Sequence, residues 1–187
     1  GQISQWQSQI ETIQDQPYLD RADLLAEQGD LESAIANARM IQSGRALYTQ
    51  AQGRIERWRT QIQRTEDRPI LAQARQLAES GQLQQAITVA SQIRSGRVLY
   101  GDAQQEISRW RGRLEGQRQL QRAYEVAQTG TVSALIDAIR LAQQVPSNSP
   151  QRSEAVAAAD GWSWDILTVA EAEAPFNSER AIEIATQ

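Results

Sequence analysis

The chain has 187 residues, a net charge of −4 and a mean hydropathy of −0.57. It contains no histidine and no cysteine, and all 19 basic residues are arginine. These counts exclude disulfides, thiol nucleophiles, histidine bases, zinc sites built on Cys or His, and Schiff-base lysine chemistry. No apolar run reaches the ~20 residues that span a bilayer.

Tryptophan recurs every 52 residues. The four positions are Trp6, Trp58, Trp110 and Trp162. Aligned at this offset without gaps, residues 3–54 and 55–106 are identical at 24 of 52 positions. The units are about 3–54, 55–106, a looser 107–160 and a truncated 161–187. A fixed period of this length is typical of repeat architectures, so we expect residues 1–187 to form a single helical repeat domain.

The first unit opens inside a helix. Its apolar residues Ile3, Trp6 and Ile10 have helical spacing and match the second half of the long helix in the next unit. The first half of that helix would lie upstream of Gly1. We therefore expect the chain to be a fragment of a longer protein that has further repeats before it.

The second unit shows the expected elements most fully. A long helix over about 46–66 carries apolar residues in steps of three and four. It should end before Pro69, because the residue preceding a proline is driven out of the α region, and Asp67 is placed to cap the next helix. That second helix runs to about Ser80, where Gly81 stops it. A third helix then covers about 83–93.

The C-terminal units depart from this pattern. Proline, serine and asparagine gather at 145–153 and predict a loop, and 174–178 is a second break, after which Ser178 would cap a last short helix at 179–185. The Gly-Arg and Leu-Tyr pairs of the earlier units are lost here, which fits a capping unit or the end of an array. The sequence contains no run of alternating β-branched residues that would predict a strand.

The second and third helices of each unit resemble a tetratricopeptide pair. The matching residues are Ala22, Leu25, Gly29, Ala34, Ile35 and Ala38, and then Ala74, Leu77, Gly81, Ala86, Ile87 and Ala90. In that family a small residue lets the two helices pack closely. The resemblance implies an all-α fold, an α-solenoid of three-helix repeats with a tetratricopeptide-like pair and one long Trp-bearing helix per 52 residues. The whole unit also resembles the Trp-led repeats of large, uncharacterised cyanobacterial proteins.

The tryptophans have two interpretations. A ladder of aromatic rings could stack against bases or ligands. However, each tryptophan lies in an apolar stripe, as Trp58 does between Ile55 and Ile62. We therefore assign a structural role in the core to all four, namely Trp6, Trp58, Trp110 and Trp162.

Arginine is concentrated in the middle of the chain. Residues 36–122 hold 15 arginines and seven acidic residues, whereas both flanking segments are acidic. The candidate binding residues are Arg45, Arg97, Arg57, Arg59, Arg109, Arg111 and Arg113. They would form a stripe for phosphate or an acidic partner, or a solvated face paired with glutamates. For Arg45 and Arg97 the structural alternative is a glycine turn, with arginine bonding the carbonyls that end the preceding helix.

The sequence points away from catalysis. It lacks the usual nucleophile, base and metal-ligand sets, so we expect no enzyme activity, no catalytic residue, no metal and no cofactor. By analogy with other solenoids we expect a cytoplasmic domain for protein–protein interaction or scaffolding, whose protein partner the sequence does not identify. One alternative is binding to nucleic acid or an anionic surface through the arginines, against which the acidic ends and missing lysine argue. Another is a purely structural spacer.

Overall fold

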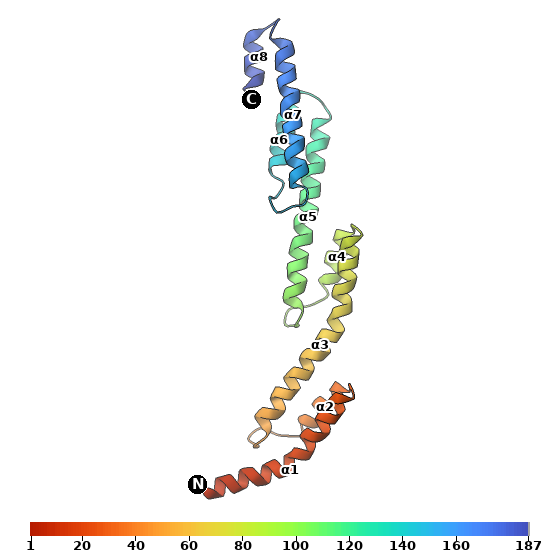
Figure 1. Cartoon of the computed structure of the whole chain (residues 1–187), viewed down its shortest axis with the longest axis vertical. Coiled ribbons are helices and arrows are strands. Elements are labelled where there is room, and N and C mark those ends of the chain that lie inside the picture. The colour runs from red at the N-terminus through yellow and green to blue at the C-terminus, as the bar shows by residue number, and fades with distance from the viewer. Residues whose placement is uncertain (187) are drawn as a thin grey trace. The chain divides into compact units, whose positions relative to one another are not determined.

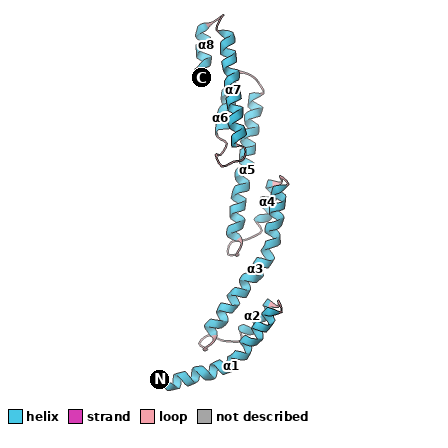
Figure 2. Ribbon diagram, viewed as in Figure 1, coloured by secondary structure: helices cyan, strands magenta, loops and turns pink. Residues whose placement is uncertain are grey.

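The computed structural model describes residues 1–186, and within them it contains eight α-helices and no strand (Figure 1, Figure 2). The prediction of an all-α fold is therefore confirmed for this part of the chain. The helices are α1 (Gln2–Glu27), α2 (Leu31–Ala38), α3 (Tyr48–Glu79), α4 (Leu83–Ala90), α5 (Tyr100–Ala127), α6 (Val132–Gln143), α7 (Arg152–Glu173) and α8 (Ser178–Ala185). Long and short helices alternate along the chain.

Each of the first two repeats uses one long helix where two were expected. α3 continues through Pro69, and α1 continues through Pro17. A proline inside a helix removes one N–H and crowds the carbonyl four residues earlier, which can bend the helix without ending it. α1 changes direction along its length in Figure 1. The predictions of three helices per repeat and of Asp67 as a helix cap are therefore wrong.

The short helices have well-defined ends. Asp30 caps α2, since its carboxylate accepts a 3.0 Å hydrogen bond from the Ser33 amide. Asn177 caps α8 in the same way, with a 3.1 Å bond from the Arg180 amide. The cap of α8 was expected at Ser178, which is instead the first helical residue. Gly81 ends the preceding long helix with φ of +83°, as predicted.

The chain divides into two compact units, and the first comprises residues 1–73 and 92–103. Its main core joins α1, α2 and the N-terminal half of α3. The core residues include Leu19, Ala22, Leu31, Ile35, Ala38, Ile41, Ala51, Ile55 and Trp58. Beside this core, Arg54 Nε donates a 2.8 Å hydrogen bond to Asp23 Oδ1. Trp58 is thus covered by the helices that precede it in the chain.

The second unit comprises residues 74–91 and 104–187, described here as far as residue 186. One cluster in it surrounds Trp110 and a second surrounds Trp162. Their members include Ala78, Leu83, Ile87, Ile107 and Trp110 in the first, and Leu120, Leu135, Ala142, Val145, Trp162, Ile166 and Ile184 in the second. The Tyr124 ring meets the Trp162 ring edge-on, with centroids 5.4 Å apart.

An ion pair in the second unit reverses one in the first. Arg75 Nε donates to Glu106 Oε1 at 3.1 Å. At the 52-residue offset these positions match Asp23 and Arg54, so the acid and the base have changed places. The same two positions are therefore joined by an ion pair in both repeats, with opposite polarity.

None of the helices in residues 1–186 is both long enough and apolar enough to cross a bilayer.

Candidate functional site

The arginines of the two Gly-Arg pairs, Arg45 and Arg97, each form an ion pair with a buried aspartate. We call each of these ion pairs a clasp. Arg45 donates from Nη2 to Asp15 Oδ1 at 2.7 Å and from Nε to Asp15 Oδ2 at 2.8 Å. Arg97 donates to Asp67 in the same two-pronged way, at 2.6 and 3.0 Å, and to Glu66 Oε2 at 2.7 Å. Each arginine ties the turn before a long helix to the middle of the previous long helix. Gly44 and Gly96 supply the predicted positive φ, at +88° and +87°.

Burial and charge make these clasps strong. Asp15 and Asp67 are only 5% and 2% exposed, so each carboxylate is removed from water and depends on its arginine. Hydrogen bonding from Arg45 lowers the pKa of Asp15, and Asp15 in turn raises the pKa of Arg45. Asp67 and then Glu66 raise the pKa of Arg97. The expected alternative, arginine bonding to helix-ending carbonyls, is wrong for these two residues, whose main partners are carboxylates.

The other five candidate arginines do not converge on one site. Arg59 pairs with Glu56 one turn earlier, and Arg109 lies 3.8 Å from Glu106. Arg57 donates from Nε to the Gly53 carbonyl of its own helix at 3.4 Å. Arg111 and Arg113 form no ion pair within residues 1–186. Most of the predicted stripe is thus a helix surface with local partners.

Three of the four tryptophans are buried, as predicted, and one is exposed. Trp58, Trp110 and Trp162 are buried, at 8%, 5% and 9% exposure. Trp6 is 60% exposed, so its assignment to the core is wrong. The reason is that Trp58 packs against α2, which precedes it, whereas no short helix precedes Trp6 within residues 1–186.

The third repeat replaces the clasp with two small residues. Ser149 stands at the Arg97 position, and Gly116 takes the Asp67 position once the three-residue deletion in α5 is counted. Ser149 is 7% exposed and donates a 2.6 Å hydrogen bond from Oγ to Gln151 Oε1. Here Arg152 does bond helix-ending carbonyls, those of Gln143 and Val145, both at 3.0 Å.

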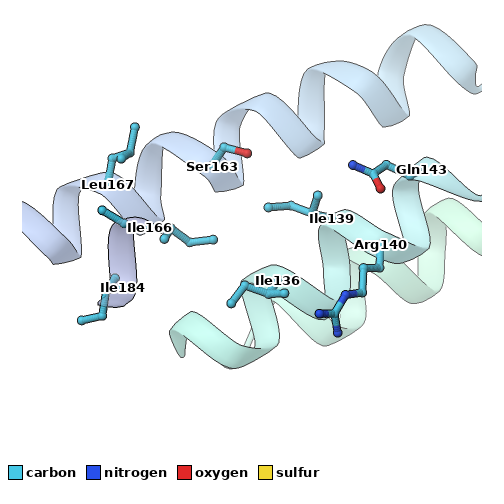
Figure 3. Close-up of a pocket in the computed structure, with 9 residues that line it drawn as sticks. Ile136, Ile139, Arg140, Gln143, Ser163, Ile166, Leu167 and Ile184 are labelled. Carbon is cyan, nitrogen blue, oxygen red and sulfur yellow. The ribbon is translucent and has the colours of Figure 1, made fainter. Parts of the chain in front are cut away.

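An apolar groove of about 440 Å³ opens between α6, α7 and α8, with lining residues from the third and fourth sequence units (Figure 3). Ile136 and Ile139 line it from α6, Ser163 and Ile166 from α7, and Ile184 from α8. Leu167 is 40% exposed on the α7 side, so apolar surface remains open to solvent. Arg140 lines the groove as well, and its Nη1 donates to Asp137 at 3.1 Å.

Sequence reasoning missed this groove, although a signal was available. At the 52-residue offset, Ile136 stands where the earlier repeats have Glu32 and Gln84. Ser163 replaces Arg59 and Arg111, and Leu167 replaces Gln63 and Glu115. A comparison of the repeats position by position therefore identifies groove positions at which a polar or charged residue has become apolar or small.

The side chains that line the groove are suited to binding. Its lining offers apolar contact area, one guanidinium, one amide and one hydroxyl. Within residues 1–186 no three carboxylates, histidines or cysteines gather as a metal site. A groove of this size and composition suits aliphatic or aromatic side chains. Comparison with protein-family models, curated proteins and solved structures finds no match for this chain.

Proposed function

We propose that this chain is a non-enzymatic, tetratricopeptide-like repeat domain for protein–protein interaction or scaffolding, and that the groove between α6, α7 and α8 receives an apolar segment of a partner protein. The observation that carries the proposal is the change of three groove positions from polar or charged to apolar or small, at Ile136, Ser163 and Leu167.

Energetics support this use of the groove. An exposed leucine and two half-buried isoleucines line the groove, and apolar surface left in water costs about 25 cal/mol per Å². Contiguous exposed apolar patches on soluble proteins often mark interaction sites. Arg140 lines the groove and is paired with Asp137, so the apolar side chains supply most of the contact area.

The test gives the groove the polar residues that stand 52 positions earlier in the chain. The variant Ile136→Gln, Ser163→Arg and Leu167→Glu introduces the residues found at 84, 111 and 115. The wild-type domain and this variant are used as baits in lysate, with nuclease and at two salt concentrations. We expect a set of proteins retained by the wild type and lost from the variant.

The control is Val156→Gln, at a 44%-exposed position of α7 outside the groove, which should keep the same proteins. Circular dichroism checks that both variants remain helical. If the groove variant keeps every wild-type protein, or if the wild type retains none, the proposal is wrong.

A second candidate function rests on three arginines of α3. Arg57, Arg64 and Arg68 are exposed, follow one another at spacings of seven and four, and line a depression of about 600 Å³. None of them forms an ion pair within the part of the chain that the structure describes. Such a basic helix face could hold an anionic surface or nucleic acid.

Salt dependence separates this candidate from the first. Binding of a labelled single-stranded oligonucleotide should weaken steeply between low and moderate salt if phosphates are neutralised. The triple variant Arg57→Gln, Arg64→Gln and Arg68→Gln should then lose binding, whereas Arg140→Gln should not. Binding that ignores salt, or that survives the triple variant, would eliminate this candidate.

A further inference from the structure

The C-terminal half of α1 exposes two acidic side chains with a leucine between them. Asp20 and Glu27 are seven residues apart, which places them on the same side of the helix, and both are exposed. Leu24 lies between them and is 52% exposed. Neither acid forms an ion pair within residues 1–186, although Asp20 accepts a 2.7 Å hydrogen bond from Gln16 Nε2. We call Asp20, Leu24 and Glu27 the acidic face.

The same side of the long helix is open in the later repeats, so its exposure is a property of the repeat. At the 52-residue offset the equivalent residues of α3 are all exposed, and they are Ala72, Gln76 and Glu79. The equivalent residues of α5, with its three-residue deletion counted, are exposed as well, and they are Gln121, Glu125 and Gln128. Of these three repeats, the first alone places two acids and an apolar side chain on this side.

The arginines of α3 form a face with matching spacing. Arg57 and Arg64 are seven residues apart, about 10.5 Å along the helix, and Arg68 follows one turn later. These arginines line the depression of about 600 Å³ together with Thr60 and Gln61. We call Arg57, Arg64 and Arg68 the basic face. Its three positive charges form no ion pair within residues 1–186.

An antiparallel alignment brings the charges of the two faces into register. With Glu27 opposite Arg57, the shared spacing of seven residues places Asp20 opposite Arg64. Leu24 then lies between the two charge pairs, over the depression that the arginines line. Two ion pairs would thus flank one apolar contact.

We propose that the basic face of one copy of this chain binds the acidic face of a second copy, with α3 and α1 antiparallel. Charge complementarity identifies a second copy as the occupant, because opposite charges meet at the same spacing. A nucleic acid would satisfy the arginines too, but it would leave the acidic face without a partner. The inference goes beyond the proposed function, since neither face contributes a residue to the groove between α6, α7 and α8.

The contact should be weak and sensitive to salt. Ion pairs between exposed side chains stabilise a contact only modestly, and dissolved salt screens them. In sedimentation equilibrium at protein concentrations up to ~1 mM, where weak contacts are populated, we expect the wild type to self-associate reversibly at low salt. Its association constant should fall by ~10-fold when the salt concentration is raised to several times the physiological value.

Reversal of the charge on one face at a time tests the proposal. Asp20→Arg with Glu27→Arg makes both faces of the chain positive, and Arg57→Glu with Arg64→Glu makes both faces negative. All four positions are exposed, so the fold is not at risk, and circular dichroism checks that the variants remain helical. Each double variant alone should associate at least ~10-fold more weakly than the wild type, because attraction has become repulsion.

A mixture of the two double variants gives the decisive result. Each face of one variant then meets a face of opposite charge on the other, so the mixture should form heterodimers about as readily as the wild type forms homodimers. The control is Asp160→Arg with Glu171→Arg, which makes the same change of net charge at two exposed positions of α7 outside both faces. This control should associate as the wild type does.

The protein is treated with nuclease before every measurement. A wild type that stays monomeric, double variants that associate when alone, or a mixture that stays monomeric would each overturn the proposal. Loss of association in the α7 control would overturn it as well, because net charge and not the acidic face would then be responsible. Association that is found only without nuclease would replace it with the second candidate function, which uses the same arginines.

Discussion

Gly116 of α5 and Ser149 of the α6–α7 turn lie in direct contact. A Cβ added to Gly116 would stand 3.0 Å from Ser149 Cβ and would overlap Ser149 Oγ. In the preceding repeat the same two positions hold Asp67 and Arg97, which form a partly buried ion pair. Ser149 therefore occupies the space that a side chain at position 116 would need.

This contact predicts an unusual result for a glycine in the interior of a helix. Gly116→Ala should lower the free energy of unfolding by about 1–3 kcal/mol, because the added methyl overlaps a buried side chain. Gly112→Ala, one turn earlier in α5, meets no atom within 4 Å and should raise stability by up to about 1 kcal/mol. Urea unfolding monitored by circular dichroism compares the two. Equal and stabilising effects would contradict the close contact.

The Arg45–Asp15 clasp predicts a stability that depends on acid pH. The pKa of Asp15 in the folded chain lies below its unfolded value of 3.8, chiefly because Arg45 donates hydrogen bonds to the carboxylate. Its contribution is therefore fully present above the unfolded pKa and is lost as pH falls through the lower, folded pKa. Asp15→Asn should be less stable than the wild type at neutral pH, and the difference should shrink in strong acid. Urea midpoints measured over a pH series provide the check, and a difference that does not change with pH would rule out the clasp.

The reversed ion pairs predict rescue by exchange of charges. Asp23→Arg alone places two arginines together at positions 23 and 54 and should destabilise the first unit. Arg54→Glu added to it recreates the polarity of Arg75 and Glu106. A double-mutant cycle should give a favourable coupling of about 0.5–1 kcal/mol, the range for partly exposed pairs. A coupling of zero would mean that the polarity does not matter.

Two tryptophans at equivalent positions should respond very differently to removal. Trp58→Ala empties a buried site and should cost about 3–5 kcal/mol. Trp6→Ala changes an exposed side chain and should stay within about 0.5 kcal/mol when unfolding is measured on dilute, monomeric protein. Similar losses at the two positions would show that Trp6 is covered in solution even in the monomer.

The all-α fold and most of the core could be predicted from the sequence, because a 52-residue period and helical spacing of apolar residues reveal which faces are buried. The helix boundary at Pro69 could not. Local preference at a proline favours a break, but α3 packs on both sides of it, through Trp58 before it and Leu71 after it. The packing of α3 on both sides of Pro69 thus outweighed the tendency of proline to end a helix.

The site was harder to predict than the fold. The arginines attracted attention because charge is visible in a sequence, yet the partners of Arg45 and Arg97 are carboxylates about 30 residues away, which spacing alone does not reveal. The exposure of Trp6 depends on which neighbour covers it, and that is a property of the assembled helices. The groove arises from substitutions relative to earlier repeats, so only a comparison between repeats could have found it.

The clasps also bear on proteolysis. Trypsin must draw a lysine or arginine side chain into its specificity pocket before it cuts, and this chain offers it arginine alone. In the turns before α3 and α5, Arg45 and Arg97 already have their guanidinium groups held by Asp15 and Asp67, whereas Arg39 and Arg94 of the same turns are exposed and form no ion pair within residues 1–186. Trypsin could cut the peptide bonds after Arg45 and Arg97 only once the ion pairs of these arginines had broken. We therefore expect limited trypsin digestion to cut these turns after Arg39 and Arg94 before it cuts them after Arg45 and Arg97.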